Sequence, residues 1–196
     1  MSDHVHISRR DFLARLSLLG SLAMAFPATL LAELRTSKQA EKQPDWAAKH
    51  PWNTIAAVQE VLFPPGDDIP GASDIGALAY LYRAIEDPGS YREDRDFIFK
   101  GVGWLNDLTQ ERHKKNYLQL SGAEREKTID TIVQSRAGRN WVSLLLTYIL
   151  EALTADPIYG GNTYGIGWKW LEHQPGYPRP SADKTWDKLL QRRYRL

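Results

Sequence analysis

Few residues of this 196-residue chain have the type and spacing that a reaction centre needs. The chain has no cysteine, which excludes disulfides, thiolate metal sites, iron–sulfur clusters and covalently attached c-type haem. Asp156, Asn162 and His173 carry atoms that could ligate a metal, but their spacing fits no metal motif. His50 and His113 have no Ser or Asp partner at a readable spacing. The sequence therefore predicts no catalytic residue and no metal or cofactor in this chain.

Nucleotide and nucleic-acid binding are also disfavoured. Gly165-Ile166-Gly167 has part of the glycine pattern of a dinucleotide-binding loop, but no strand precedes it and the third glycine is missing. A net charge of +1 provides no long-range field that would attract nucleic acid. A stand-alone enzyme or small-ligand binder that uses this loop as its pocket stays open as an alternative. It would need convergent titratable groups, which the sequence does not offer.

The segment from Thr154 to Pro180 is instead rich in glycine, proline and aromatic residues. Four glycines lie within eight residues from Gly160 to Gly167, which allows positive φ angles and close approach by another surface. Tyrosine and tryptophan are favoured at protein interfaces because they combine a large apolar ring with a polar end. The segment predicts either a docking surface or a loop whose aromatic side chains fold back onto their own core.

The N-terminal residues, 1–32, have the layout of a targeting signal: a polar head followed by an uncharged run from Leu16 to Ala32. The residues that match the twin-arginine export signal are Ser8, Arg9, Arg10, Phe12 and Leu13. We expect an export signal that the twin-arginine translocase recognises and that delivers the folded protein to the periplasm. Cleavage could follow Ala25 or Ala32. An amphipathic N-terminal helix or a retained membrane anchor is the alternative, although Pro27 interrupts the apolar run.

The rest of the chain predicts an all-α fold that positions the glycine-rich segment. Residues 33–51 are expected to be a linker or arm, mobile unless a partner holds it. Apolar residues recur at helical spacing over 55–62, 78–85, 93–113, 121–133 and 141–153. Ser73-Asp74 is the expected cap of the second stretch, and Ser121 with Glu124 forms a capping box for the fourth.

The stretch 141–153 has the widest apolar face, which predicts a central and nearly enclosed helix. No run of strand length alternates polar and apolar residues. We expect one compact helical domain over residues 52–196, with a long Gly/Pro/Trp-rich C-terminal loop segment and a preceding signal helix.

The run Ala155 to Asn162, followed by Gly165, Gly167-Trp168-Lys169 and residues 175–180, resembles the gluconate 2-dehydrogenase subunit 3 family. The resemblance reaches upstream to Leu62-Phe63-Pro64 and covers most of residues 52–180, and the twin-arginine leader fits it too. Members of that family are small subunits of bacterial periplasmic, membrane-associated FAD-dependent alcohol and sugar dehydrogenases.

The resemblance implies a non-catalytic partner. In that family a large subunit holds FAD and oxidises the sugar, sugar acid or polyol, and a cytochrome c subunit usually passes electrons on to quinone. The small subunit would act as folding partner and export escort of the flavoprotein, with peripheral association at the inner membrane through the complex. A membrane-tethering structural subunit that keeps residues 8–32 is the other alternative. The candidate partner-binding residues are Asp156, Pro157, Tyr159, Gly160, Gly161, Asn162, Trp168 and Trp170, with Asp156 also able to brace the loop itself.

Overall fold

The computed structural model of the chain describes residues 32, 44–87, 92–186 and 188–189. Within these ranges the elements are helical and no strand occurs, which confirms the all-α prediction. The α-helices are α3 (Trp52–Leu62), α4 (Ala77–Glu86), α5 (Arg92–His113), α6 (Gly122–Ile132), α7 (Arg136–Thr154) and α8 (Ile166–Trp170), and the 3-10 turns are η1 (Tyr117–Gln119), η2 (Pro157–Tyr159) and η3 (Thr163–Gly165). The predicted export signal with its helix, including Arg9 and Arg10, lies outside the described residues, as does 33–43 of the predicted linker.

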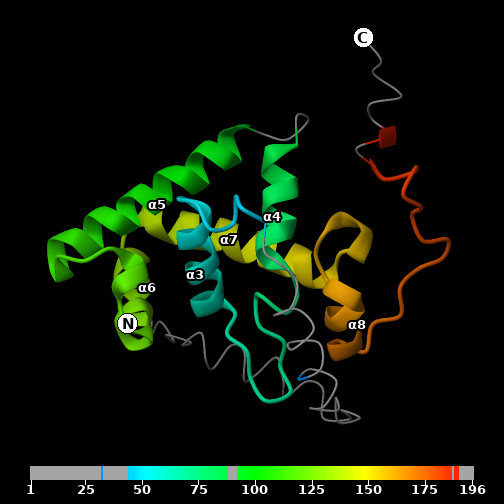
Figure 1. Cartoon of the computed structure of the whole chain (residues 1–196), viewed down its shortest axis with the longest axis horizontal. Coiled ribbons are helices and arrows are strands. Elements are labelled where there is room, and N and C mark those ends of the chain that lie inside the picture. The colour runs from blue at the N-terminus through cyan, green and yellow to red at the C-terminus, as the bar shows by residue number, and fades with distance from the viewer. Residues whose placement is uncertain (1–31, 33–43, 88–91, 187, 190–196) are drawn as a thin grey trace, which may run out of the picture.

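Helix α7 is the central element, because it contacts α3, α4, α5 and α8 (Figure 1). Its inward face buries Trp141, Leu145 and Ile149 completely. These side chains belong to one hydrophobic core that also includes Ile55 of α3 and Leu81 of α4. Burial of such side chains is the main favourable contribution to the stability of the fold.

The predicted enclosure of α7 is wrong, because one face of the helix lies at the surface. Leu150 is 50% exposed, and Ser143 and Thr147 on the same side are also exposed. The helix also begins five residues earlier than expected. Its first turn is polar and is capped by Ser135, whose hydroxyl accepts a hydrogen bond from the Gly138 N–H at 2.9 Å.

Two of the expected helix boundaries depend on caps, with different outcomes. The capping box of α6 is confirmed, since the Glu124 carboxylate accepts from the Ser121 N–H at 2.8 Å while Ser121 accepts from the Glu124 N–H. The Ser73-Asp74 cap of α4 is wrong. The N-cap position is Gly76 in a left-handed conformation, and Asp74 accepts from the Gly71 N–H within the preceding loop at 2.8 Å.

Helices α5 and α7 approach each other at Gly101. A Cβ atom at this position would overlap the Trp141 indole, so only glycine fits there. The indole Nε1 donates a hydrogen bond to the Ile98 carbonyl at 3.0 Å, one turn earlier in α5. The interior glycine therefore allows the closest contact between the two longest helices, although it weakens α5 as an isolated helix.

The last part of the predicted linker packs on the domain. The Trp46 ring stacks on Tyr82 of α4 with 3.8 Å between centroids, and it meets Trp52 edge-on at 5.5 Å. Ala47 beside it is buried. Residues 44–51 therefore belong to the folded body rather than to a free arm. Over the described ranges, no helix combines the length and apolar character that crossing a bilayer would require.

Candidate functional site

The candidate site is the C-terminal segment, residues 155–186, which follows α7. It contains η2, η3 and the short α8, and then an extended stretch that runs along the outside of the helices (orange to red in Figure 1). From Leu171 to Lys184 every residue except Pro180 is exposed. The segment therefore has two parts. The bonded part, residues 155–170, lies against the end of α7, and the extended part, residues 171–186, is attached to the body at few points.

Asn162 holds the bonded part together from the inside. Its side chain is fully buried, and its Nδ2 donates to the Ala155 carbonyl at 2.9 Å. Its Oδ1 accepts from the Gly167 N–H at 2.7 Å, and less closely from the Trp168 N–H at 3.4 Å. One side chain thus connects the end of α7 with the start of α8, and it satisfies backbone groups that would otherwise be buried without a partner.

Gly161 is also inside the fold. A Cβ atom there would lie 2.7 Å from the Ala152 carbonyl oxygen of α7, closer than real atoms pack. Gly161 and Asn162 were predicted to form or to support the contact with a partner. In the structure both are buried and support the loop from the inside.

Asp156 braces the loop, as the sequence had suggested. Its carboxylate accepts from the Ile158 N–H at 3.0 Å, which caps η2. It also accepts from Arg179 Nε at 2.8 Å and Nη2 at 3.1 Å, a two-pronged ion pair across 23 residues of chain. The hydrogen bonds from Arg179 are the main cause that holds the pKa of Asp156 below its usual value. The ion pair ties the extended stretch back to the end of α7.

Trp168 completes this attachment. Its Nε1 donates to the Thr154 carbonyl at 2.7 Å, and the Arg179 guanidinium lies 5.1 Å from the centre of its ring. Trp170, two residues later, meets Phe63 edge-on at 6.2 Å. Both predicted anchor tryptophans are half-buried and already make contacts within the chain.

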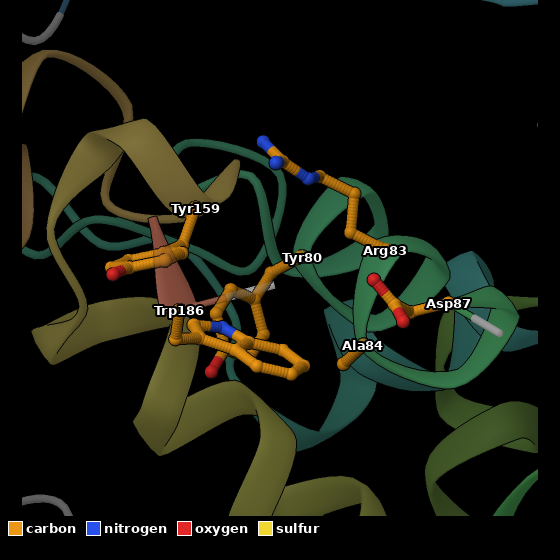
Figure 2. A pocket seen from close by; sticks show the side chains of 6 residues that line it. All are labelled: Tyr80, Arg83, Ala84, Asp87, Tyr159 and Trp186. Carbon is orange, nitrogen blue, oxygen red and sulfur yellow. The ribbon is translucent and has the colours of Figure 1, made fainter. Parts of the chain in front are cut away.

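Tyr159 lies in a groove between η2 and α4 (Figure 2). The residues that line this groove are Tyr80, Arg83, Ala84, Asp87, Tyr159 and Trp186. Arg83 Nη1 donates to the Ile158 carbonyl at 2.8 Å, so α4 and η2 are bonded directly. Of the remaining predicted residues, Pro157 begins η2 and Gly160 follows it as the C-cap, with a φ of 92°.

Tyr80 connects the same groove to α7. Its hydroxyl donates to the Glu151 carboxylate at 3.2 Å. Burial is the main cause that raises the pKa of Tyr80 to about 12, and the negative charge of Glu151 adds to it. Figure 2 shows the Trp186 ring beside Tyr80, while the Arg83 guanidinium points away. Sequence reasoning missed both Tyr80 and Trp186, because no local pattern joins residues so far apart.

The most exposed aromatic side chains of the segment are not among the predicted partner-binding residues. Tyr177 is 97% exposed and Tyr164 is 61% exposed. Tyr164 also has a φ of 53°, a left-handed conformation that is unfavourable for a residue with a Cβ. Tyr164 is therefore both exposed and held in a strained backbone conformation. Sequence reasoning missed this residue too, although it lies within the segment that was singled out.

The hydrogen bonds of Asn162 and Asp156 fix the shape of the C-terminal segment. Among the described residues, no group of three or more His, Asp or Glu side chains could hold a metal ion. Each shifted carboxyl or tyrosine pKa there has a local cause. The capping box lowers the pKa of Glu124, and burial with a hydrogen bond to Asp94 raises that of Tyr148.

The comparison with known families gives a match over most of the described helical body. The family model described as gluconate 2-dehydrogenase subunit 3 matches residues 49–176, more than half of the chain. The match includes all of the helices from α3 to α8 and ends inside the extended stretch. No curated protein and no solved structure matches the chain.

Proposed function

The chain belongs to the gluconate 2-dehydrogenase subunit 3 family, small subunits of dehydrogenase complexes, and from this premise we propose that it accompanies an FAD-bearing large subunit as a non-catalytic partner. The large subunit would oxidise a sugar, a sugar acid or a polyol, and a cytochrome c subunit could pass the electrons on. The observation that supports the proposal is the family match, which covers the C-terminal segment as far as residue 176, including the part that the buried Asn162 side chain holds together.

The segment is suited to docking because it is held before a partner arrives. Asn162 fixes its bonded part, and the Asp156–Arg179 ion pair fixes its extended part. A rigid surface loses less conformational entropy on binding, so more of the contact energy remains as affinity. Tyr164 and Tyr177 are the two most exposed aromatic side chains of the described residues, and they would serve as anchors.

A mutation of Tyr164 tests the docking surface with little risk to the fold. We expect Tyr164→Ala to weaken co-purification of a yellow, flavin-bearing partner with the tagged chain, because it removes an exposed ring. Leu150→Ala is the control, since it removes a similarly exposed apolar side chain from the outer face of α7. A colourless protein that purifies alone from its native cells would overturn the proposal itself. Equal recovery of partner with both variants would overturn the placement of the docking surface.

We further propose that this subunit is the export escort of the flavoprotein. The support is the twin-arginine pattern of residues 8–13, together with the need of a flavoprotein to acquire FAD in the cytoplasm before export. The folded pair would then cross together and remain in the periplasm, associated with the inner membrane.

The export proposal predicts where dehydrogenase activity is found. Arg9→Lys with Arg10→Lys should leave the activity of the large subunit in the cytoplasm, because the receptor reads the arginine pair. Arg15→Lys makes the same chemical change outside the pair and should leave export unchanged. Normal periplasmic activity in the double variant would contradict the escort role.

A further inference from the structure

Positive charge is concentrated at one end of the described body. Residues 111–139 run from the last turn of α5 through η1 and α6 into the start of α7, and they contain seven basic and four acidic residues. The described residues outside this stretch contain nine basic and fifteen acidic residues. Residues 111–139, here called the basic end, therefore have a net charge of +3, and the rest of the described body has a net charge of −6.

Side-chain contacts hold the basic end together. Arg112 Nη1, in the last turn of α5, donates to the Thr131 hydroxyl of α6 at 3.1 Å. Arg125 Nη2 of α6 donates to the Leu118 carbonyl of η1 at 2.6 Å. Figure 1 shows α6 and the C-terminal end of α5 at one end of the long axis of the molecule, and α8 toward the other. The basic end therefore lies away from the C-terminal segment.

The basic side chains of this end face solvent and are not neutralised by ion pairs. Within the described ranges, no lysine or arginine of the basic end forms an ion pair. Unpaired charges of one sign at a surface produce a potential that attracts ions of the other sign. The exposed basic residues are Arg112, Lys114, Lys115, Lys127, Arg136 and Arg139.

The start of α7 shows that some of these charges do not serve the fold. Arg136 and Arg139 lie within the first four residues of the helix, whose first turn contains no acidic residue. The N-terminus of a helix carries a partial positive charge, so acidic residues stabilise it and basic residues are unfavourable there. An anion that binds beside these two arginines would remove this repulsion.

The composition of the surface favours a lipid bilayer over a protein or a nucleic acid as the source of that anion. Protein interfaces are depleted in lysine and depend on aromatic anchors, whereas the one aromatic residue of the basic end, Tyr117, is buried. Glu111 and Glu126 are exposed among the basic residues and would repel the fixed phosphates of a nucleic acid. A fluid bilayer can arrange its anionic headgroups around them, and Leu118, 38% exposed, can enter its headgroup region.

We propose that the basic end binds the surface of a membrane that contains anionic phospholipids, with its lysine and arginine side chains on the lipid phosphates. The rest of the described body is negative and would be repelled by the same surface. The C-terminal segment would therefore face away from the membrane. The proposed function brings the subunit to the membrane only through its complex, whereas this contact belongs to the chain itself and needs no flavoprotein.

Charge should dominate the affinity. Each basic residue close to an anionic bilayer increases binding by about fivefold, and salt reduces this effect. We therefore expect the protein to bind vesicles that contain phosphatidylglycerol far better than vesicles of phosphatidylcholine alone, and to be released by added salt. The triple variant Lys114→Gln, Lys115→Gln, Lys127→Gln should bind the anionic vesicles about tenfold to a hundredfold more weakly.

The test is co-sedimentation with vesicles of the protein in the form purified from its cells. The control triple variant Lys49→Gln, Lys169→Gln, Lys184→Gln makes the same charge change at exposed positions outside the basic end. It should bind the anionic vesicles nearly as the unchanged protein does. Urea unfolding of both triple variants should match that of the unchanged protein, because none of the six lysine side chains forms an ion pair with a described residue.

Equal binding to anionic and neutral vesicles, or equal losses in the two triple variants, would overturn the proposal. Duplex DNA that competes as well as anionic vesicles at the same phosphate concentration would also overturn it, because the basic end would then bind phosphate charge without preference for a bilayer. The vesicles contain no flavoprotein, so failure of the chain to bind a flavoprotein would leave this result unchanged.

Discussion

Replacing Asn162 with alanine is expected to destabilise the protein by about 4 kcal/mol. The variant would leave the Gly167 N–H and the Ala155 carbonyl buried without their partner, and each such loss costs about 1–3 kcal/mol. The backbone at this position has a φ of 47°, and alanine in that conformation costs about 1–2 kcal/mol more. These contributions add to a loss that is large compared with the total stability of an average domain.

Urea unfolding followed by tryptophan fluorescence measures this change in the free energy of unfolding. Two further variants separate its causes. Asn162→Gly removes the same hydrogen bonds but adopts a left-handed backbone freely, so it should cost about 1 kcal/mol less than alanine. Asn162→Asp puts a buried carboxylate oxygen against the Ala155 carbonyl in place of the donor, so it should cost at least as much as alanine. A loss below about 1 kcal/mol for the alanine variant would refute the assignment of Asn162 as the central support of the loop.

Three further predictions concern the C-terminal segment and helix α5. Gly161→Ala should lower the free energy of unfolding by about 1–3 kcal/mol, because its Cβ would meet the Ala152 carbonyl. Gly103→Ala in α5 should raise the free energy of unfolding by about 0.5–1 kcal/mol, because a Cβ there would have no atom within 4 Å and alanine favours a helix. Equal effects of the two glycine variants would contradict the packing described at Gly161. The stability difference between the unchanged protein and Asp156→Asn should be full above the ordinary Asp pKa of 3.8 and shrink as the pH falls through the lowered folded value, because protonation breaks the ion pair with Arg179. A difference that stays constant down to acid pH, measured by urea unfolding, would show that the charge of Asp156 contributes nothing.

Sequence reasoning worked for the fold where the physical signal is local. The capping box at Ser121 and the proline after Phe63 act within one turn, so α6 and the end of α3 were predictable. The start of α7 was missed because no large apolar residue follows the Ser135 cap until Trp141. Its exposed face was missed because width of the apolar stripe does not say how many neighbours a helix has.

The candidate site was predictable only as a region. Glycine and tryptophan content pointed to residues 154–180, but the inward position of Asn162 depends on hydrogen bonds that form only after α7 and α8 are in place. The ion pair between Arg179 and Asp156 likewise joins two loops, and no periodic pattern in the sequence predicts such a pair. The stacking of Trp46 on Tyr82 was missed because a charged, proline-containing stretch is typical of linkers.

The contact between Gly101 and Trp141 limits how the molecule can move. The indole ring occupies the space where a side chain at position 101 would project, and it is hydrogen-bonded to the carbonyl of Ile98. Sliding or rotation of α5 along α7 would therefore require a clash or a broken bond, since packed interiors do not deform continuously. These two helices therefore form a stiff frame that keeps Thr154, the last residue of α7, in a fixed position for the C-terminal segment that follows it.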